Sequence, residues 1–114
     1  MEFSDVNGDH DAMSHPRAVN LNELPPSTTL LVWTWNSLYR VVVTRGCNVT
    51  VQGGTFFPDS TFAHVNGATS GGSWLKVGWI GVGFLIEFDA AGARIVTSPV
   101  LAIAIQRRGV ATVH

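Results

Sequence analysis

The chain has 114 residues, of which 46% are hydrophobic and only 13% are charged, and its formal net charge is −1. Folded domains typically carry about 25% charged residues, whereas disordered chains combine a high charge with few apolar residues. The composition therefore excludes a mostly disordered chain and predicts one folded domain of ordinary size.

Residues 1–20 are polar and show no hydrophobic periodicity. The first 16 residues contain four carboxylates and no Lys or Arg, whereas the rest of the chain contains all seven basic residues and four carboxylates. This stretch also lacks the basic start and apolar middle of a secretion signal. We therefore predict a flexible acidic tail over residues 1–20, ahead of a mildly basic body, and a cytoplasmic protein.

Residues 5–11 begin like a calcium-binding loop, with oxygen-bearing side chains at alternate positions. Such a loop needs Gly at its sixth position and a bidentate Glu at its twelfth, and these positions hold His10 and Pro16. A structural zinc site needs four ligands at fixed spacing, and Cys47 is the only cysteine of the chain. We therefore expect no metal ion, no cofactor and no intramolecular disulfide.

After Pro25 and Pro26, runs rich in β-branched and aromatic residues alternate with turn signals made of Gly, Asn, Asp and Ser. This pattern predicts an all-β fold, a small barrel or sandwich of seven to nine short, mostly antiparallel strands. We expect a single β domain over residues 21–107 and a C-terminal tail over residues 108–114. No apolar run approaches the ~20 residues of a membrane helix, so we expect no membrane partner. The predicted strands are residues 28–35, 38–45, 49–52, 55–57, 61–65, 74–77, 82–88, 93–97 and 100–106.

The alternation within the strands predicts which residues face the core. In strand 82–88, the alternate residues Val82, Phe84, Ile86 and Phe88 are all apolar, so we expect this face to be buried. Strand 28–35 is apolar on both faces, which predicts cover on both sides. The connections are predicted as turns at 36–37, 46–48, 58–60 and 89–92 and as a loop at 66–73.

Asp59, Ser60 and His64 are close in sequence and are the nearest approach to a catalytic set. A strand would hold Ser60 and His64 on one face but about 13 Å apart, at ~3.3 Å per residue, which is too far for a nucleophile and its base. The glycine-rich residues 67–72 and 78–83 precede no predicted helix, so they favour close strand packing over a phosphate-binding loop. These observations favour a non-enzymatic protein.

The sequence therefore favours a binding or assembly module that self-associates into a homo-oligomer. A small domain has little interior, and few charges are available here to cover its surface. One alternative is a single-stranded nucleic-acid-binding β barrel, which would use aromatic and basic side chains. Another is a small enzyme or ligand-binding barrel with a pocket near His64, whose small-molecule ligand stays unknown. The candidate binding residues are Trp33, Trp35, Tyr39, Arg40, Asp59 and His64.

Overall fold

The computed structural model describes residues 13–106. These residues form eleven β-strands and one short 3-10 helix, Leu21–Glu23, which confirms the all-β prediction, although the predicted number of seven to nine strands is too low. None of the described residues belongs to a helix long and apolar enough to cross a membrane. The strands are β1 (Met13–Ser14), β2 (Ala18–Asn20), β3 (Thr29–Thr34), β4 (Leu38–Arg45), β5 (Asn48–Gly53), β6 (Phe57–Thr69), β7 (Leu75–Val77), β8 (Trp79–Gly81), β9 (Leu85–Ala90), β10 (Ala93–Val96) and β11 (Val100–Gln106).

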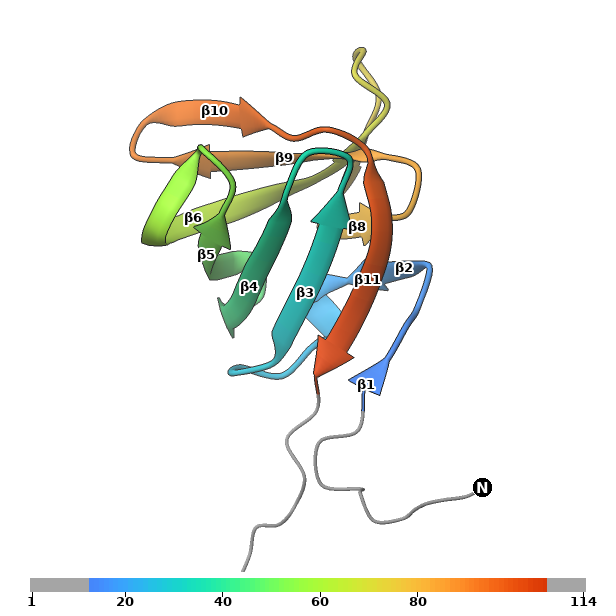
Figure 1. Cartoon of the computed structure of the whole chain (residues 1–114), viewed down its shortest axis with the longest axis vertical. Coiled ribbons are helices and arrows are strands. Elements are labelled where there is room, and N and C mark those ends of the chain that lie inside the picture. The colour runs from blue at the N-terminus through green and yellow to red at the C-terminus, as the bar shows by residue number, and fades with distance from the viewer. Residues whose placement is uncertain (1–12, 107–114) are drawn as a thin grey trace, which may run out of the picture.

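Nine of the strands form one curved sheet in the order β1-β11-β3-β4-β5-β6-β9-β10, with β7 paired to β6 (Figure 1). Every pair is antiparallel, as predicted. Within the described residues, β1 and β10 stand at the two ends of this order and do not pair with each other. The sheet is therefore not closed, and the prediction of a barrel is wrong.

A second sheet of two strands, β2 and β8, lies against β6 and β9. It contributes Val19 and Ile80 to the core, and the adjoining 3-10 helix contributes Leu21. These buried side chains show that the small second sheet covers part of the core of the large sheet.

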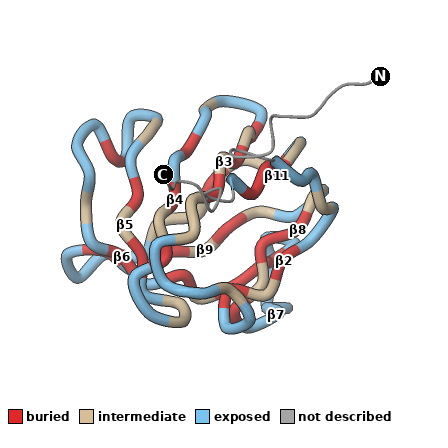
Figure 2. The backbone as a smooth tube through the Cα atoms, turned by 90° about the horizontal axis from the view of Figure 1, so that it is seen from below, coloured by how far each residue is buried: buried red, intermediate tan, exposed pale blue. Residues whose placement is uncertain are grey.

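The core is built from alternate residues of the large sheet, as the pattern of buried and exposed segments in Figure 2 shows. Leu30 and Val32 supply it from β3, where the intervening residues are half-buried. Phe57 and Phe88 meet edge to face with ring centroids 5.4 Å apart, and the ring of Tyr39 lies 6.3 and 6.5 Å from these two rings. Apolar area and favourable ring geometry therefore stabilise the same cluster.

The prediction of two short strands around a turn at 58–60 is wrong. Residues 58–60 lie within β6, which includes Phe57 and the predicted strand 61–65 and continues to residue 69, so that half of the predicted loop 66–73 is also strand. Residues 55 and 56 of the first predicted strand belong to the β5–β6 turn. Proline is tolerated in a sheet where no ladder hydrogen bond is needed from it. Pro58 meets this condition because the register of β5 against β6 shifts just there, between Val51 and Gly53.

The facing of two predicted strands is also partly wrong. Phe84 precedes β9 and is 39% exposed, whereas Ile86 and Phe88 are fully buried. The reason is a tight turn, in which the Phe84 amide donates to the Gly81 carbonyl and Gly83 has a φ of +92°. In the first predicted strand, cover on both sides fails at Trp35, which is 72% exposed.

The prediction of a flexible tail over residues 1–20 is wrong for residues 13–20. Within this stretch β1 pairs with β11 and β2 pairs with β8, and Val19 is buried. This stretch has too few alternating apolar residues to be recognised as strand from the sequence. Backbone pairing with a partner strand, together with one buried side chain, is enough to hold it in place. The remainder of the predicted tail and the predicted C-terminal tail at 108–114 lie outside the described residues.

The predicted hairpin at 89–92 is confirmed and has a specific geometry. β9 ends at Ala90 and β10 begins at Ala93, so the loop has two residues. Ala91 has a φ of +50° and Gly92 a φ of +81°. Two consecutive positive φ angles define the type I′ turn, whose twist matches that of the flanking strands.

Candidate functional site

The six candidate binding residues do not form one site. Tyr39 is 2% exposed and its ring belongs to the core, so it is not available to a ligand. Trp33 is half-buried on β3, and Trp35 lies just beyond the end of that strand. Arg40 is exposed on β4, where it pairs with Leu31 on one side and Gln52 on the other. Trp33 pairs with Leu38, so Trp33 and Arg40 lie in neighbouring rows on the same face of β3 and β4, whereas Trp35 lies beyond the end of β3.

Asp59 and His64 are both exposed on β6, but they are five residues apart. At ~3.3 Å per residue, a strand places residues that are five apart about 16 Å from each other. The strand thus does not bring the carboxylate of Asp59 to the imidazole of His64.

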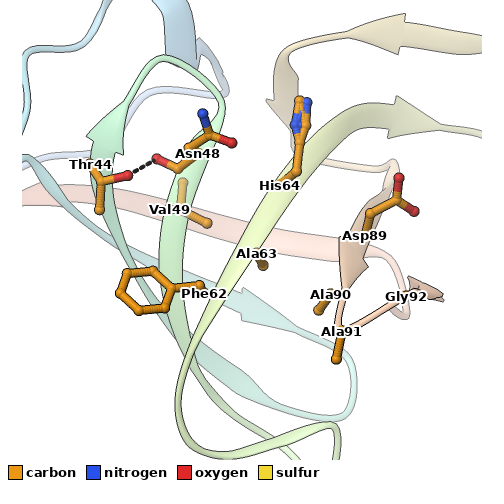
Figure 3. A pocket seen from close by; sticks show the side chains of 10 residues that line it. All are labelled: Thr44, Asn48, Val49, Phe62, Ala63, His64, Asp89, Ala90, Ala91 and Gly92. Carbon is orange, nitrogen blue, oxygen red and sulfur yellow. Dashed lines mark hydrogen bonds between the residues drawn. The ribbon is translucent and has the colours of Figure 1, made fainter.

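A shallow hollow of about 380 Å³ lies beside His64, between the β4–β5 and β9–β10 hairpins (Figure 3). A hollow near this histidine was an expectation of the sequence, but Asp59 and residues 66–73 are not among the described residues that line it. Its wall is apolar below and polar at the rim. The lining residues are Thr44, Asn48, Val49, Phe62, Ala63, His64, Asp89, Ala90, Ala91 and Gly92.

The polar rim comes from one row of residues across three strands. His64 of β6 is paired with Asn48 of β5 on one side and with Asp89 of β9 on the other. Directly opposed residues of antiparallel strands have Cβ atoms about 4.5–5.5 Å apart. Asn48, His64 and Asp89 therefore project as neighbours, although they are separated by many residues in the sequence (Figure 3).

The hollow can form hydrogen bonds with a polar ligand. The rim presents an amide, an imidazole and a carboxylate, which can donate and accept hydrogen bonds. Of the described residues that line the hollow, none is Ser or Cys, and the Thr44 hydroxyl already donates to the Asn48 carbonyl at 2.7 Å. The hollow therefore offers recognition of a polar ligand but no activated nucleophile.

Glu87 lies on the same side of β9 as Asp89, two residues earlier, and has two partners. The Asn66 side-chain amide donates to its Oε2 at 2.8 Å, and an Arg94 guanidinium nitrogen lies 3.8 Å from its Oε1. Arg94 is largely exposed, so this ion pair contributes little to stability. The effect of the ion pair is electrostatic, because the carboxylate of Glu87 balances the positive charge of Arg94.

Metal binding finds no support within residues 13–106, where no three His, Cys, Asp or Glu side chains form a group that could hold an ion. The calcium-like residues 5–11 lie outside the described residues. Cys47 is half-buried, and its Sγ lies 3.8 Å from Oδ1 of Asn22.

Exposed apolar side chains gather at one end of the molecule, which we call the apolar end. Backbone hydrogen bonds join Trp35 to Pro99 and Val100 to both Gly83 and Phe84, at 2.8–3.1 Å. The ring of Phe84 packs on that of Trp74, with centroids 5.3 Å apart. Residues 33–38, 70–75, 82–85 and 97–102 form this end, and none of them is charged. Its exposed large side chains are Trp35, Leu38, Trp74, Leu75, Phe84 and Leu101.

Sequence reasoning missed Phe62, which is 79% exposed on the central strand β6, and it placed Phe84 in the core. A signal for Phe62 exists in the strand itself. Ala63 and Val65 form a wholly apolar alternate set, whereas Phe62 shares its face with polar His64. The apolar set turns inward, so the phenylalanine is left outside.

No family model, no curated protein and no solved structure matches this chain. Any functional proposal for this protein therefore rests on the geometry of the described residues.

Proposed function

We propose that this protein is a non-enzymatic binding and assembly module that self-associates through its apolar end. The supporting observation is the gathering of six exposed large apolar side chains on four chain segments that contain no charged residue. Monomeric proteins rarely expose large contiguous apolar patches, and those that occur mark interaction sites. These exposed side chains thus account for part of the excess of hydrophobic over charged residues in the sequence.

A second copy of the chain is the occupant that suits this surface, and the simplest assembly is a homodimer. A two-fold axis places the same patch of both subunits in contact, so any charged residue within the patch would lie near a residue of the same charge. The apolar end avoids this repulsion because it carries no charge. Trp35 and Trp74 also supply the large aromatic side chains that dominate the binding energy of protein interfaces.

Cytoplasmic localisation is part of the same proposal. It is supported by Cys47, a free half-buried thiol, because unpaired cysteines are typical of reducing compartments.

Sedimentation and light scattering at micromolar concentrations test the dimer against a chain mass of 12.2 kDa. We expect the wild-type protein to dimerise and the double variant Trp35→Ser, Leu101→Ser to be monomeric. Loss of one hot-spot side chain costs about 2 kcal/mol or more, or roughly thirtyfold in the dissociation constant. Both side chains are more than half exposed, so these substitutions leave the core intact.

Phe62→Ser is the matched control, because Phe62 is the most exposed large apolar side chain and lies on β6, away from the apolar end. This variant should dimerise like the wild type. A wild-type protein that is monomeric at every concentration contradicts the proposal. So does a dimer that persists in the Trp35, Leu101 double variant, since another surface would then hold it together.

A further inference from the structure

Phe62 occupies an unusual position for an exposed aromatic residue. It is 79% exposed, yet it lies on β6, a strand paired on both sides in the interior of the large sheet. No aromatic ring of residues 13–106 packs against it. Its ring therefore presents a flat apolar surface to solvent in the middle of a sheet face, beside His64 (Figure 3).

Strand register places Phe62 midway between two arginines. Phe62 pairs with Thr50 of β5, which pairs with Val42 of β4. The next row on one side contains Arg40 and Gln52, and the next row on the other side contains Asn48 and His64. A register shift after Val43 pairs Arg45 with Asn48 and so brings Arg45 into this second row. With strands about 4.8 Å apart and ~3.3 Å per residue, each arginine Cα lies about 12 Å from that of Phe62. Both guanidinium groups can therefore reach a ligand that stacks on the phenylalanine.

The charge of this face is positive. Arg40 and Arg45 are exposed, and neither forms an ion pair with a carboxylate of the described residues. Asp59, the carboxylate of β6, lies three residues before Phe62, where the register of β6 against β5 shifts. Beyond His64, Asp89 adds one exposed carboxylate in the same row, and further along β9 Glu87 matches the charge of Arg94. Both arginines lie on β4, neither β4 nor β5 contains a carboxylate, and Asp89 is the neighbouring negative charge.

We propose that the face of β4, β5 and β6 binds single-stranded nucleic acid, with a base stacked on Phe62 and phosphates held by Arg40 and Arg45. An exposed aromatic ring flanked by cations is the arrangement that single-strand binders use, because every base has a face that can stack. Asn48, Gln52 and His64 supply donors and acceptors within reach of base edges. A duplex offers no exposed base face and is a poor ligand for this surface.

Phe62 lies in the row of Val42, four residues along β4 from Leu38 of the apolar end, whereas Arg40 borders that end. Arg45 and Asn48 flank the β4–β5 turn at the other end of β4. The dimer is tested at Trp35 and Leu101 and base stacking at Phe62, so either proposal can fail without the other.

Fluorescence anisotropy with a labelled 12-nucleotide oligothymidylate tests the site on the full chain. We expect binding at low salt that weakens with a slope of about −1.4 in log K against log salt, from ~0.7 per phosphate contact and two arginines. Phe62→Ala should weaken binding by roughly 5–150-fold. Phe56→Ala is the matched control, because Phe56 is also more than half exposed but lies in the β5–β6 turn. It should bind like the wild type.

The charge contribution has its own control. The double variant Arg40→Gln, Arg45→Gln should bind with a weaker salt dependence than the wild type. The double variant Arg17→Gln, Lys76→Gln removes the same amount of charge elsewhere and should keep the wild-type salt dependence. Absence of binding up to about 100 μM protein at low salt overturns the proposal. Equal affinity for an abasic strand of the same length, or equal affinity of Phe62→Ala and Phe56→Ala, also overturns it. Displacement of the oligonucleotide by polyglutamate at equal charge would indicate an acidic peptide ligand and overturn it too.

Discussion

Ala91 is held in a backbone conformation that suits another residue better. It is the first residue of the β9–β10 turn, with a φ of +50°, and its side chain is exposed. The left-handed conformation costs a residue with a Cβ about 1–2 kcal/mol, and Asn tolerates it best after Gly. Because Gly92 already occupies the second position, Ala91→Asn creates the Asn-Gly pair that type I′ hairpins prefer.

The expected gain is about 0.5–1 kcal/mol, since Asn recovers part of the strain and no buried contact is lost. Ala91→Gly should give a similar gain, because full relief of strain is offset by about 0.4–1 kcal/mol of added unfolded-state entropy. For a domain of this size, 1 kcal/mol corresponds to about 4–8 °C in Tm, so either variant should melt roughly 2–8 °C higher.

Thermal unfolding followed by circular dichroism measures this gain at one fixed protein concentration, because the proposed dimer would make Tm depend on concentration. Ala93→Asn is the matched control. Ala93 is exposed in β10 of the same hairpin, and Asn is disfavoured in strands, so its Tm should not rise. Ala91→Val should melt lower, since a β-branched residue fits positive φ poorly. If Ala91→Asn and Ala91→Gly both melt at the wild-type temperature, the strain assigned to the positive φ of Ala91 is refuted.

Two further predictions follow from the packing. Gly67→Ala should cost more than about 2 kcal/mol in urea denaturation, because its Cβ would lie 2.2 Å from the Lys76 carbonyl oxygen, whereas Gly72→Ala has no atom within 4 Å and should stay within ~0.5 kcal/mol of wild type. Ile86→Ala should cost about 2–5 kcal/mol, and Phe84→Ala less than about 1.5 kcal/mol, because only Ile86 is fully buried. Equal losses at residues 84 and 86 would show that Phe84 packs in the core after all.

Much of the local structure follows from the sequence alone. Alternation within residues 38–45 places the apolar Tyr39, Val41 and Val43 on one face, and all three are buried. The 89–92 turn was recognisable because Gly follows two small residues at the end of an apolar run. These features depend on backbone preferences and on a period of two, both of which act between near neighbours.

The tertiary structure decided which faces lie inside and which distant residues meet. Alternation shows that Phe62 and His64 share the more polar face of their strand, but it does not show which side chains of other strands lie beside them. The row of Asn48, His64 and Asp89 and the apolar end each join segments far apart in the chain. Their positions depend on long-range strand register, which many weak contacts set together and no local pattern encodes.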